Sequence, residues 1–479
     1  MHLSAPDPRP RVLHVTQPVD GGVARVVTDL ARAQLAAGLH VAVACPDSRL
    51  AAELRSLGAE VRRWEATRSP GPTLVREVLR LGHVVEGVRP DLVHLHSAKA
   101  GLAGRLAVRG RTPTVFQPHA WSFEAVDGAM ARLALKWERR GARWASRVVC
   151  VSEAERATGV RAGIDAPWTV VPNGIDHERF HPAAVDTVRA TLLPDVDPAA
   201  PLVVCVGRLC RQKGQDVLLD AWYAVHDRVP RARLVLVGDG PDAARLRSRA
   251  PESVVFAGSV PDAAPWYQAA DLVVLPSRWE GMALAPLEAM ACGRPVVVTD
   301  VDGARESLPP GLAPRCVVPP DDPARLAASV AELLLDPLLR ESLGHQGRRH
   351  VLSTHDVRRA AEAGAGGYRG PPGRRGTPGG AQGTKPPQLR EAHPPGLWER
   401  PSPPPRGAAG RARADPRRGP RLVRLVAPRA PHRRGASGAP PPRGRGRPLH
   451  HSPPTLALPR FINPDCLGVG VSRWSRGLR

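Results

Sequence analysis

Residues 271–300 read DLVVLPSRWEGMALAPLEAMACGRPVVVTD, and this stretch decides the fold. Its two apolar runs, at 271–276 and 295–300, have the length of buried strands, and the segment between them is predicted to form a helix. Strand, helix, strand in succession is the unit of a parallel sheet covered by helices. Glu280 follows the first strand and Glu288 lies further along, in the helix. Ligands bind at the carboxyl ends of such strands, so both carboxylates are candidate site residues.

The same alternation of apolar runs and helical patterns extends through most of the chain. The predicted strands are 11–16, 40–44, 91–96, 112–117, 147–152, 202–208, 233–238, 254–258, 271–276 and 295–300. The predicted helices are 23–37, 73–87, 99–109, 126–146, 214–229, 285–292, 323–336, 337–343 and 346–363. Turn residues interrupt the pattern at 172–201. We therefore predict an α/β protein with two doubly wound Rossmann-like domains, at 1–180 and 201–362, joined by a linker at 181–200 and facing a central cleft.

The formal net charge of +23 is concentrated at one end of the chain. Residues 364–479 carry 23 Lys and Arg against four Asp and Glu, together with 23 Pro and 20 Gly. This composition is typical of disordered, low-complexity sequence. Because Arg, Pro, Gly and Ala have GC-rich codons, we interpret 363–479 as a tail that a frameshift near residue 363 produces, in preference to an evolved basic tail. The charge therefore gives little support to a nucleic-acid partner, since the rest of the chain is close to neutral.

Other protein classes find no support in the sequence. The seven cysteines form no Cys-x-x-Cys pair, so neither a disulfide framework nor a zinc site is indicated. No apolar run has the length of a membrane-spanning helix, and the first ten residues lack the apolar stretch of a secretory signal, so a cytoplasmic location is expected.

Several loops after predicted strands carry groups suited to a nucleotide diphosphate. In GRLCRQKG, residues 207–214, Arg208 and Lys213 can clamp a diphosphate beside a helix N-terminus, or can be two solvated surface cations. In the loop of Glu280, the amides of residues 282–284 point toward whatever occupies the start of the next helix. The alternative for Glu280 is an acid that the helix dipole favours.

These motifs, with LVLVGDGP, FAGSVPD and VDGARE in the same order, resemble glycosyltransferase family 4, the retaining enzymes of the GT-B fold. The resemblance covers residues 11–362, and its hallmark is the pair of glutamates separated by seven residues, E280-GMALAPL-E288. It implies that Arg208 and Lys213 bind the donor diphosphate. It implies that Glu280 binds the donor sugar and that Glu288 binds the ribose. The amides assigned to the donor sugar are those of Met282, Ala283 and Leu284.

The first domain is expected to hold the acceptor. Gly21 and Gly22 in the loop QPVDGG permit close approach of the backbone to the acceptor and the donor phosphate, or form only a tight turn. The family places a histidine against the transferred sugar at the position of His119, which we predict to be catalytic together with Glu280. We interpret His94 and His96 as structural.

The segment around Asn173 and Gly174 resembles the family's interdomain hinge. In the family the last helix crosses back to brace the first domain. The chain departs from that pattern after HDVRRAAEA, residues 355–363, so the crossover is expected to be missing.

The resemblance implies a retaining transfer of sugar from a UDP- or GDP-linked donor to a hydroxyl of a glycan or lipid-linked acceptor, as in polysaccharide, glycolipid or cell-envelope synthesis. No metal-ligand cluster is apparent, so the two cations are expected to neutralise the leaving diphosphate without a metal or other cofactor. The basic segment Arg132–Arg147, with Trp137 and Trp144 interleaved, can rest on the inner face of an anionic membrane or can be a solvated face. The alternative functions are a nucleotide-sugar epimerase on the same fold and a nucleic-acid-binding protein that acts through its basic tail.

Overall fold

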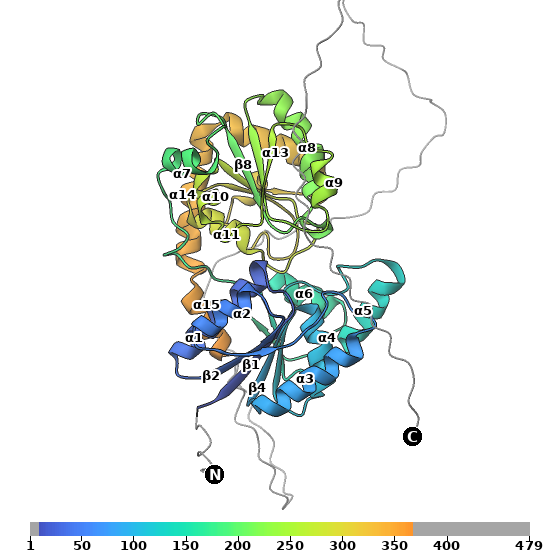
Figure 1. The fold of residues 1–479 in the computed structure, drawn as a ribbon. Helices are drawn as coiled ribbons and strands as arrows, with labels where there is room; N and C mark the ends of the chain where they lie inside the picture. Colours follow the sequence, from blue (N-terminus) through green and yellow to red (C-terminus); the bar gives the residue numbers. More distant parts are fainter. Residues whose placement is uncertain (1–8, 367–479) are drawn as a thin grey trace, which may run out of the picture. The chain divides into compact units, whose positions relative to one another are not determined.

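The structure is a computed structural model that describes residues 9–366, with side chains to residue 363. These residues form two parallel sheets, each covered by helices (Figure 1). Beyond residue 366 the predicted tail lies outside the described residues. Within the described part, no helix is long and apolar enough to cross a bilayer.

The first sheet has seven parallel strands in the order β3-β2-β1-β4-β5-β6-β7. The strands are β1 (Arg11–Thr16), β2 (His40–Cys45), β3 (Glu60–Arg63), β4 (Leu92–His96), β5 (Thr114–Gln117), β6 (Arg147–Cys150) and β7 (Trp168–Val170). The helices are α1 (Gly21–Ala36), α2 (Arg49–Ser56), α3 (Leu74–Val88), α4 (Ser97–Val108), α5 (Gly128–Gly141), the 3₁₀ turn η1 (Ala142–Trp144) and α6 (Glu153–Arg161).

Burial on both faces explains why the strands are apolar without alternation. In β2, Val41 and Val43 belong to an apolar cluster with α1 and α2. Their neighbours Ala42 and Ala44 belong to a second cluster with α3 and α4. Helices α1 and α2 therefore cover one face of this sheet, and α3 and α4 cover the other (Figure 1).

The second sheet has six parallel strands in the order β10-β9-β8-β11-β12-β13, around a single apolar core. The strands are β8 (Leu202–Val206), β9 (Arg233–Val237), β10 (Val254–Gly258), β11 (Leu272–Leu275), β12 (Val296–Thr299) and β13 (Val317–Val318). The helices are α7 (Val185–Leu192), the 3₁₀ turn η2 (Arg211–Lys213), α8 (Gln215–Arg228), α9 (Ala243–Arg247), α10 (Ala264–Ala269), α11 (Leu284–Ala291), α12 (Ala313–Cys316), α13 (Pro323–Leu335), α14 (Pro337–Thr354) and α15 (Val357–Gly366).

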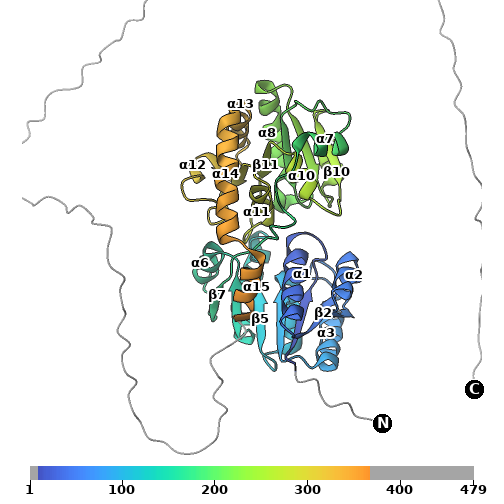
Figure 2. The ribbon, with the colours of Figure 1, turned by 90° about the vertical axis from the view of Figure 1, so that its left-hand side faces the viewer.

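The chain does cross back from the second domain to the first, which corrects the expectation that the crossover is missing. Helix α14 packs against α11, and α15 packs against α1 (Figure 2). The break between the two helices lies where Val357 donates its amide to the carbonyl of Ile175 and Ile175 donates to that of His355. These backbone bonds replace the helical ones, so the predicted helix 346–363 is in fact two helices.

Other differences from the prediction concern short or polar elements. Strands β3 and β7 have four and three residues, and helix α6 is largely polar, so all three carry too weak a periodic signal. The predicted helix 126–146 is shorter, because it ends in the 3₁₀ turn η1 before β6 begins.

Candidate active site

Lys213 and Glu280 meet at the carboxyl ends of β8 and β11. Lys213 closes the turn η2, and its Nζ lies 2.5 Å from Oε1 of Glu280. The same oxygen accepts a hydrogen bond of 2.7 Å from the hydroxyl of Ser277. The other oxygen of Glu280, Oε2, has no partner among residues 9–366, so it is available to a ligand hydroxyl. Gly214 follows Lys213 with φ +65°, and any side chain there would collide with the carbonyl of Pro276.

Arg208 lies beside this pair and faces a cation from the first domain. No ion pair or side-chain hydrogen bond of Arg208 occurs within the described part of the chain. Arg68, in the loop between β3 and α3, has a lowered pKa, first because the surrounding protein partly desolvates its guanidinium, although 46% of the side chain is exposed, and then because of the charge of Arg208. Its guanidinium lies 3.8 Å from the carboxylate of Asp20. Sequence reasoning missed Arg68, since nothing in that loop distinguishes it from a surface arginine. Arg68, Arg208 and Lys213 together can neutralise a diphosphate.

The amides before α11 form the wall next to Glu280. Within residues 9–366, no group accepts a hydrogen bond from the backbone N–H of Met282, Ala283 or Leu284. They precede or begin the eight-residue helix α11, where unpaired amides favour a negative or hydroxyl-bearing ligand. Glu280, Ala283 and Thr299 line a small cavity at this point. The expected grouping of Glu280 with these amides therefore exists in the structure.

Glu288 lies one turn into α11 and does not line that cavity. Its Oε2 accepts a hydrogen bond of 2.7 Å from the buried hydroxyl of Tyr267. Burial raises the pKa of Glu288 to about 7, while the bond from Tyr267 and the charge of Arg179 act in the opposite direction. The two glutamates of the motif are thus in different environments: Glu280 is paired with a cation, and Glu288 is paired with a neutral donor.

His119 reaches the same region from the first domain through a strained turn. His119 has φ +57° and Ala120 has φ +121°, two consecutive residues in conformations that side chains rarely adopt. A Cβ placed on Gly281 would lie 3.1 Å from the nitrogen of Ala120, so this turn packs directly on the loop of Glu280. Burial lowers the pKa of His119 to about 3, so the imidazole is neutral.

Glu155 holds this strained turn, and sequence reasoning did not identify it. Its two carboxylate oxygens each accept a backbone hydrogen bond of 2.7 Å, one from Ala120 and one from Val151. Burial raises its pKa to about 8, while these two bonds oppose the shift. The spacing of Ser152 and Glu155 is that of a capping box, which was the available signal. The serine does cap α6, but the carboxylate turns toward the loop of His119 instead.

The glycine loop lies opposite α11. Gly21, with φ +69°, begins α1, and a Cβ on Gly22 would lie 3.6 Å from the side chain of Leu284. The N-termini of α1 and α11 therefore lie close together.

Four further hydrogen bonds join the two domains beside the site. Ser152 donates to the carbonyl of Gly281 at 2.8 Å, and the side chain of Asn173 donates to that of Met282 at 2.7 Å. Glu306 accepts from the amides of residues 153 and 154, both at 2.8 Å, so this residue of the second domain caps α6 of the first. The carbonyl of Asn173 also accepts from His355 at 2.8 Å, which places this segment at the junction where the chain passes between the domains.

A histidine cluster adjoins His119 inside the first domain. His14, His94 and His96 are buried, and each can bring one ring nitrogen within 4.8 Å of the others, which is a possible metal-ligand set that the sequence pattern did not reveal. However, Nδ1 of His14 and Nε2 of His96 point at each other at 2.9 Å as a hydrogen bond. His96 also forms a hydrogen bond with His119.

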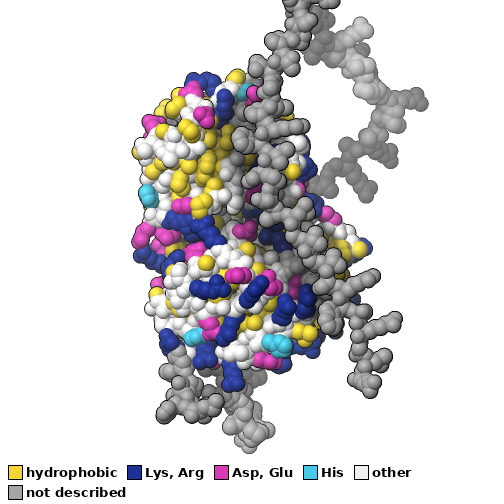
Figure 3. Space-filling model, viewed as in Figure 1, with side chains coloured by type: hydrophobic (Ala, Val, Ile, Leu, Met, Phe, Trp, Pro, Cys, Tyr) yellow, Lys and Arg dark blue, Asp and Glu magenta, His cyan; other side chains and the backbone are white. Residues whose placement is uncertain are grey.

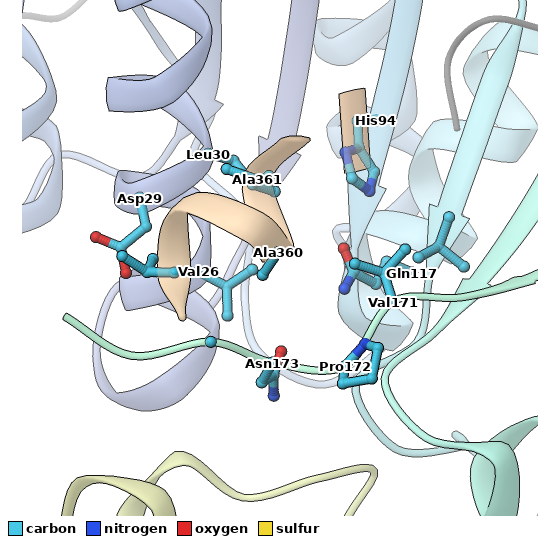
Figure 4. Close-up of a pocket in the computed structure, with 13 residues that line it drawn as sticks. Val26, Asp29, Leu30, His94, Gln117, Val171, Pro172, Asn173, Ala360 and Ala361 are labelled. Carbon is cyan, nitrogen blue, oxygen red and sulfur yellow. The ribbon is translucent and has the colours of Figure 1, made fainter. Parts of the chain in front are cut away.

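A larger pocket, of about 500 Å³ including its opening to solvent, is lined by His94 of this cluster and lies away from Lys213 and Glu280. Figure 4 shows it between Asp29 of α1, Gln117 of β5, Asn173 and Ala360 of α15. Burial raises the pKa of Asp29 to about 6, against the effect of Arg32. The pocket contains none of the residues predicted to bind the donor.

The basic segment Arg132–Arg147 covers most of α5, the turn η1 and the first residue of β6. Its charged residues Arg132, Lys136 and Arg140 are exposed, as are the apolar Met130 and Leu133, each 59% exposed. Trp137 and Trp144 pack against each other with ring centroids 6.2 Å apart. In Figure 3, basic and acidic side chains are mixed on the visible face. That face gives no support to a nucleic-acid surface.

Comparison with known sequences identifies two matching family models. Residues 20–179 match "Glycosyltransferase Family 4", and residues 200–336 match "Glycosyl transferases group 1". The lipopolysaccharide core biosynthesis mannosyltransferase LpsB of Rhizobium meliloti is 34% identical over 211 residues, which are 42% of this chain and 60% of that protein. The chain thus matches less than two thirds of this relative's length.

A longer match is to the alpha-maltose-1-phosphate synthase of Mycobacterium tuberculosis, which is 30% identical over 359 residues, 66% of this chain and 90% of the relative. Among solved structures, the Anabaena protein HepE in complex with UDP and glucose aligns with a TM-score of 0.65 and 23% identity, covering 75% of this chain and 99% of that one. The predicted fold of two doubly wound domains is confirmed.

Proposed function

Since this chain belongs to glycosyltransferase family 4, we propose that it transfers a sugar from a nucleotide diphosphate sugar to a hydroxyl group of an acceptor. The observation that carries the proposal is the pairing of Lys213 with Glu280 next to the free amides before α11, directly opposite the turn of His119. A cation, a carboxylate and unpaired amides at one point can bind a phosphate and a sugar together.

The donor diphosphate lies, in this proposal, between Lys213 and Arg208, with Arg68 adding a third positive charge from the first domain. Glu280 and the amides of Met282, Ala283 and Leu284 hold the donor sugar. Glu288 accepts hydrogen bonds from the ribose hydroxyls through the oxygen that Tyr267 leaves free. These preorganised groups stabilise the negative charge that develops on the leaving diphosphate.

We propose that the transfer retains the anomeric configuration by attack on the same face from which the diphosphate departs. An enzymatic nucleophile on the opposite face would require a free carboxylate in the first domain. Glu155 is the buried carboxylate nearest to the turn of His119, but both of its oxygens accept backbone hydrogen bonds. The departing phosphate oxygen then takes the proton of the acceptor hydroxyl, and His119 and the paired domains exclude water around it. Arg68, Arg208 and Lys213 supply the positive charge, so no metal is needed for this step.

The acceptor is proposed to be a glycan or a lipid-linked sugar of the cell envelope. Relatives that support this include the lipopolysaccharide mannosyltransferase LpsB and a galactosyltransferase of Escherichia coli that is named for a diphosphoundecaprenol acceptor. Gly21 and Gly22 lie where an acceptor would approach the donor. The exposed basic and apolar face of α5 would hold the protein on the cytoplasmic surface of the membrane, where such acceptors lie. The relatives favour neither the epimerase nor the nucleic-acid-binding alternative.

A donor screen on the purified full-length chain tests the proposal. UDP- and GDP-linked hexoses are each supplied with lipid-linked acceptor extracts, and products are identified by mass and by the anomeric NMR coupling. Transfer from one donor class with retained configuration, unaffected by chelator, supports the proposal. Inverted product would overturn the same-face mechanism, and loss of activity in chelator would overturn metal independence. Release of free sugar or an epimer with no acceptor product would favour the epimerase.

A further inference from the structure

A continuous row of hydrogen bonds runs from α1 through the first sheet to His119. The Nε2 atom of His14 lies 2.8 Å from Oε1 of Gln34, and its Nδ1 lies 2.9 Å from Nε2 of His96. The Nδ1 of His96 in turn lies 3.2 Å from Nε2 of His119. Gln34, His14 and His96 are buried, with at most 2% of each residue exposed. Solvent therefore cannot supply alternative partners to the inner members of the row.

Each imidazole in this row is neutral and carries one proton. Burial lowers the pKa of His14 to about 4 and of His119 to about 3, and it holds the pKa of His96 well below its usual value. A neutral imidazole has one nitrogen that donates and one that accepts. The proton position on one ring therefore fixes the proton position on the next.

The direction of the row is set at Gln34. Its amide oxygen can only accept, so the proton of His14 is on Nε2. The Nδ1 of His14 is then an acceptor, which requires the proton of His96 to be on Nε2. By the same reasoning the Nδ1 of His96 accepts from Nε2 of His119. The remaining nitrogen of His119, Nδ1, is left without a proton.

That nitrogen is available to a ligand. Nδ1 of His119 has no partner within residues 9–366, and the residue is only partly buried. The strained turn of His119 and Ala120 packs on Gly281, next to Glu280, so the turn that carries the ring lies beside the loop of the proposed sugar pocket. Strain of this kind persists only where surrounding contacts impose it, and the bond from Ala120 to Glu155 is one such contact.

We propose that Gln34, His14 and His96 are positioning residues that fix His119 in the tautomer whose Nδ1 accepts a hydrogen bond from a hydroxyl of the transferred sugar. The identity of that hydroxyl donor rests on the proposed function; the tautomer does not. Because the acceptor nitrogen is fixed before the donor binds, no proton needs to be rearranged when the sugar arrives. The arrangement also discriminates against a ligand that presents an acceptor at this point.

The tautomer is tested directly by two-bond ¹H–¹⁵N correlation NMR on the full chain labelled with ¹⁵N-histidine. His119→Ala assigns the signals of His119 by their disappearance. The expected spectrum has a protonated Nε2 and an unprotonated Nδ1 for His119. A proton on Nδ1 would overturn the proposal. Because this measurement needs no substrate, it stands or fails independently of the donor screen.

A variant at the start of the row tests the coupling. Methionine is similar in size to glutamine but has no strong acceptor. In Gln34→Met the proton of His14 is therefore no longer held on Nε2, and His119 should be a mixture of its two tautomers. The matched control is Thr28→Val, a buried polar residue of the same helix replaced by its isostere. We expect Gln34→Met to lower kcat about tenfold or more with a smaller change in donor KM, and Thr28→Val to leave the NMR spectrum and kcat unchanged.

Two results would count against the row. An unchanged His119 spectrum in folded Gln34→Met would mean that Gln34 does not set the tautomer. If that variant does not fold, the wild-type spectrum still decides the tautomer. A stoichiometric metal in the purified protein, found by elemental analysis and lost in His14→Ala, would mean that His14, His94 and His96 bind an ion instead.

Discussion

The ammonium nitrogen of Lys213 lies 2.5 Å from Oε1 of Glu280, although the two residues follow different strands and are separated by 67 positions in the chain. The pair is partly buried, with 19% of the lysine side chain and 9% of the glutamate side chain exposed. Each charge therefore compensates the other in a site that also contains unpaired amides. A donor diphosphate and its sugar would engage both members at once.

Removing either member of this pair should abolish most of the activity. We expect Lys213→Ala and Glu280→Ala each to lower kcat/KM by about 100-fold or more, because each loses a preorganised contact to the donor. Steady-state assays with the donor identified by the screen measure the effect. The matched control is the exposed pair of Arg315 and Glu332, 2.8 Å apart, whose alanine variants should retain activity. Near-normal turnover of folded Lys213→Ala would contradict the assignment.

Donor binding should depend on pH through Glu288. Its pKa is raised to about 7, so the carboxylate gains its charge as the pH rises through that value. A charged carboxylate accepts stronger hydrogen bonds from ribose, so donor KM should fall as the pH rises from about 6 to about 8. Tyr267→Phe removes a donor that favours the charged form, and it should move this transition to higher pH.

The control for that experiment is Tyr223→Phe, because Tyr223 is exposed and its hydroxyl donates to the backbone carbonyl of Arg249, just after α9. KM measured over the pH range for the three proteins separates the outcomes. If the dependence of donor KM on pH is the same for Tyr267→Phe and wild type, Glu288 is not the titrating group.

Glu306 should stabilise the contact between the domains. Glu306→Ala leaves the first two amides of α6 without their acceptor, and we expect a loss of about 1 kcal/mol in the free energy of unfolding. Chemical denaturation measures it. The control is the exposed Glu341, whose carboxylate lies 3.6 Å from His345 on the same helix, and Glu341→Ala should change stability by less than about 0.5 kcal/mol. Equal losses of stability in the two variants would contradict the proposed role of Glu306 in the contact between the domains.

Glu155 should be needed for the geometry of His119 as well as for stability. In Glu155→Gln the amide group can accept through only one atom, so one of the amides of Ala120 and Val151 loses its acceptor. We expect a cost of about 1–3 kcal/mol and a fall in kcat. Glu153→Gln, at an exposed position of the same helix, is the control. A fully active Glu155→Gln would show that the strained turn is held by other contacts.

The exposed face of α5 should bind anionic membranes. Met130 and Leu133 are each 59% exposed beside several Arg and Lys residues, so flotation with vesicles containing anionic lipid should carry the full chain, and high salt should weaken the binding. Leu133→Glu should reduce flotation. Leu338→Glu, at a position of α14 that is 78% exposed, should not. If the wild-type protein does not float with these vesicles, the proposed membrane contact of α5 is wrong.

Much of the fold was predictable because its signal is local. A continuous apolar run such as Arg11–Thr16 is the strand β1 with the same bounds in the structure. The run 254–258 likewise coincides with β10. The break at His355 was not predictable, because it depends on backbone bonds with Ile175, which lies far away in the chain.

The candidate site divides in the same way. Arg208, Lys213 and Glu280 stand in recognisable loops at strand ends, and the motif around Glu288 is a family signature. Arg68 and Glu155 carry no such signal, since their importance comes from what lies opposite them.

The sequence by itself determined the two doubly wound domains, the family and the loops that supply the donor groups, because apolar periodicity and motif spacing are properties of neighbouring residues. Only the tertiary structure decided that Gln34, His14, His96 and His119 form one row and that Glu306 closes one domain on the other. Such contacts join residues from different strands and helices. Their strength depends on burial and on distances that exist only after the sheets have formed.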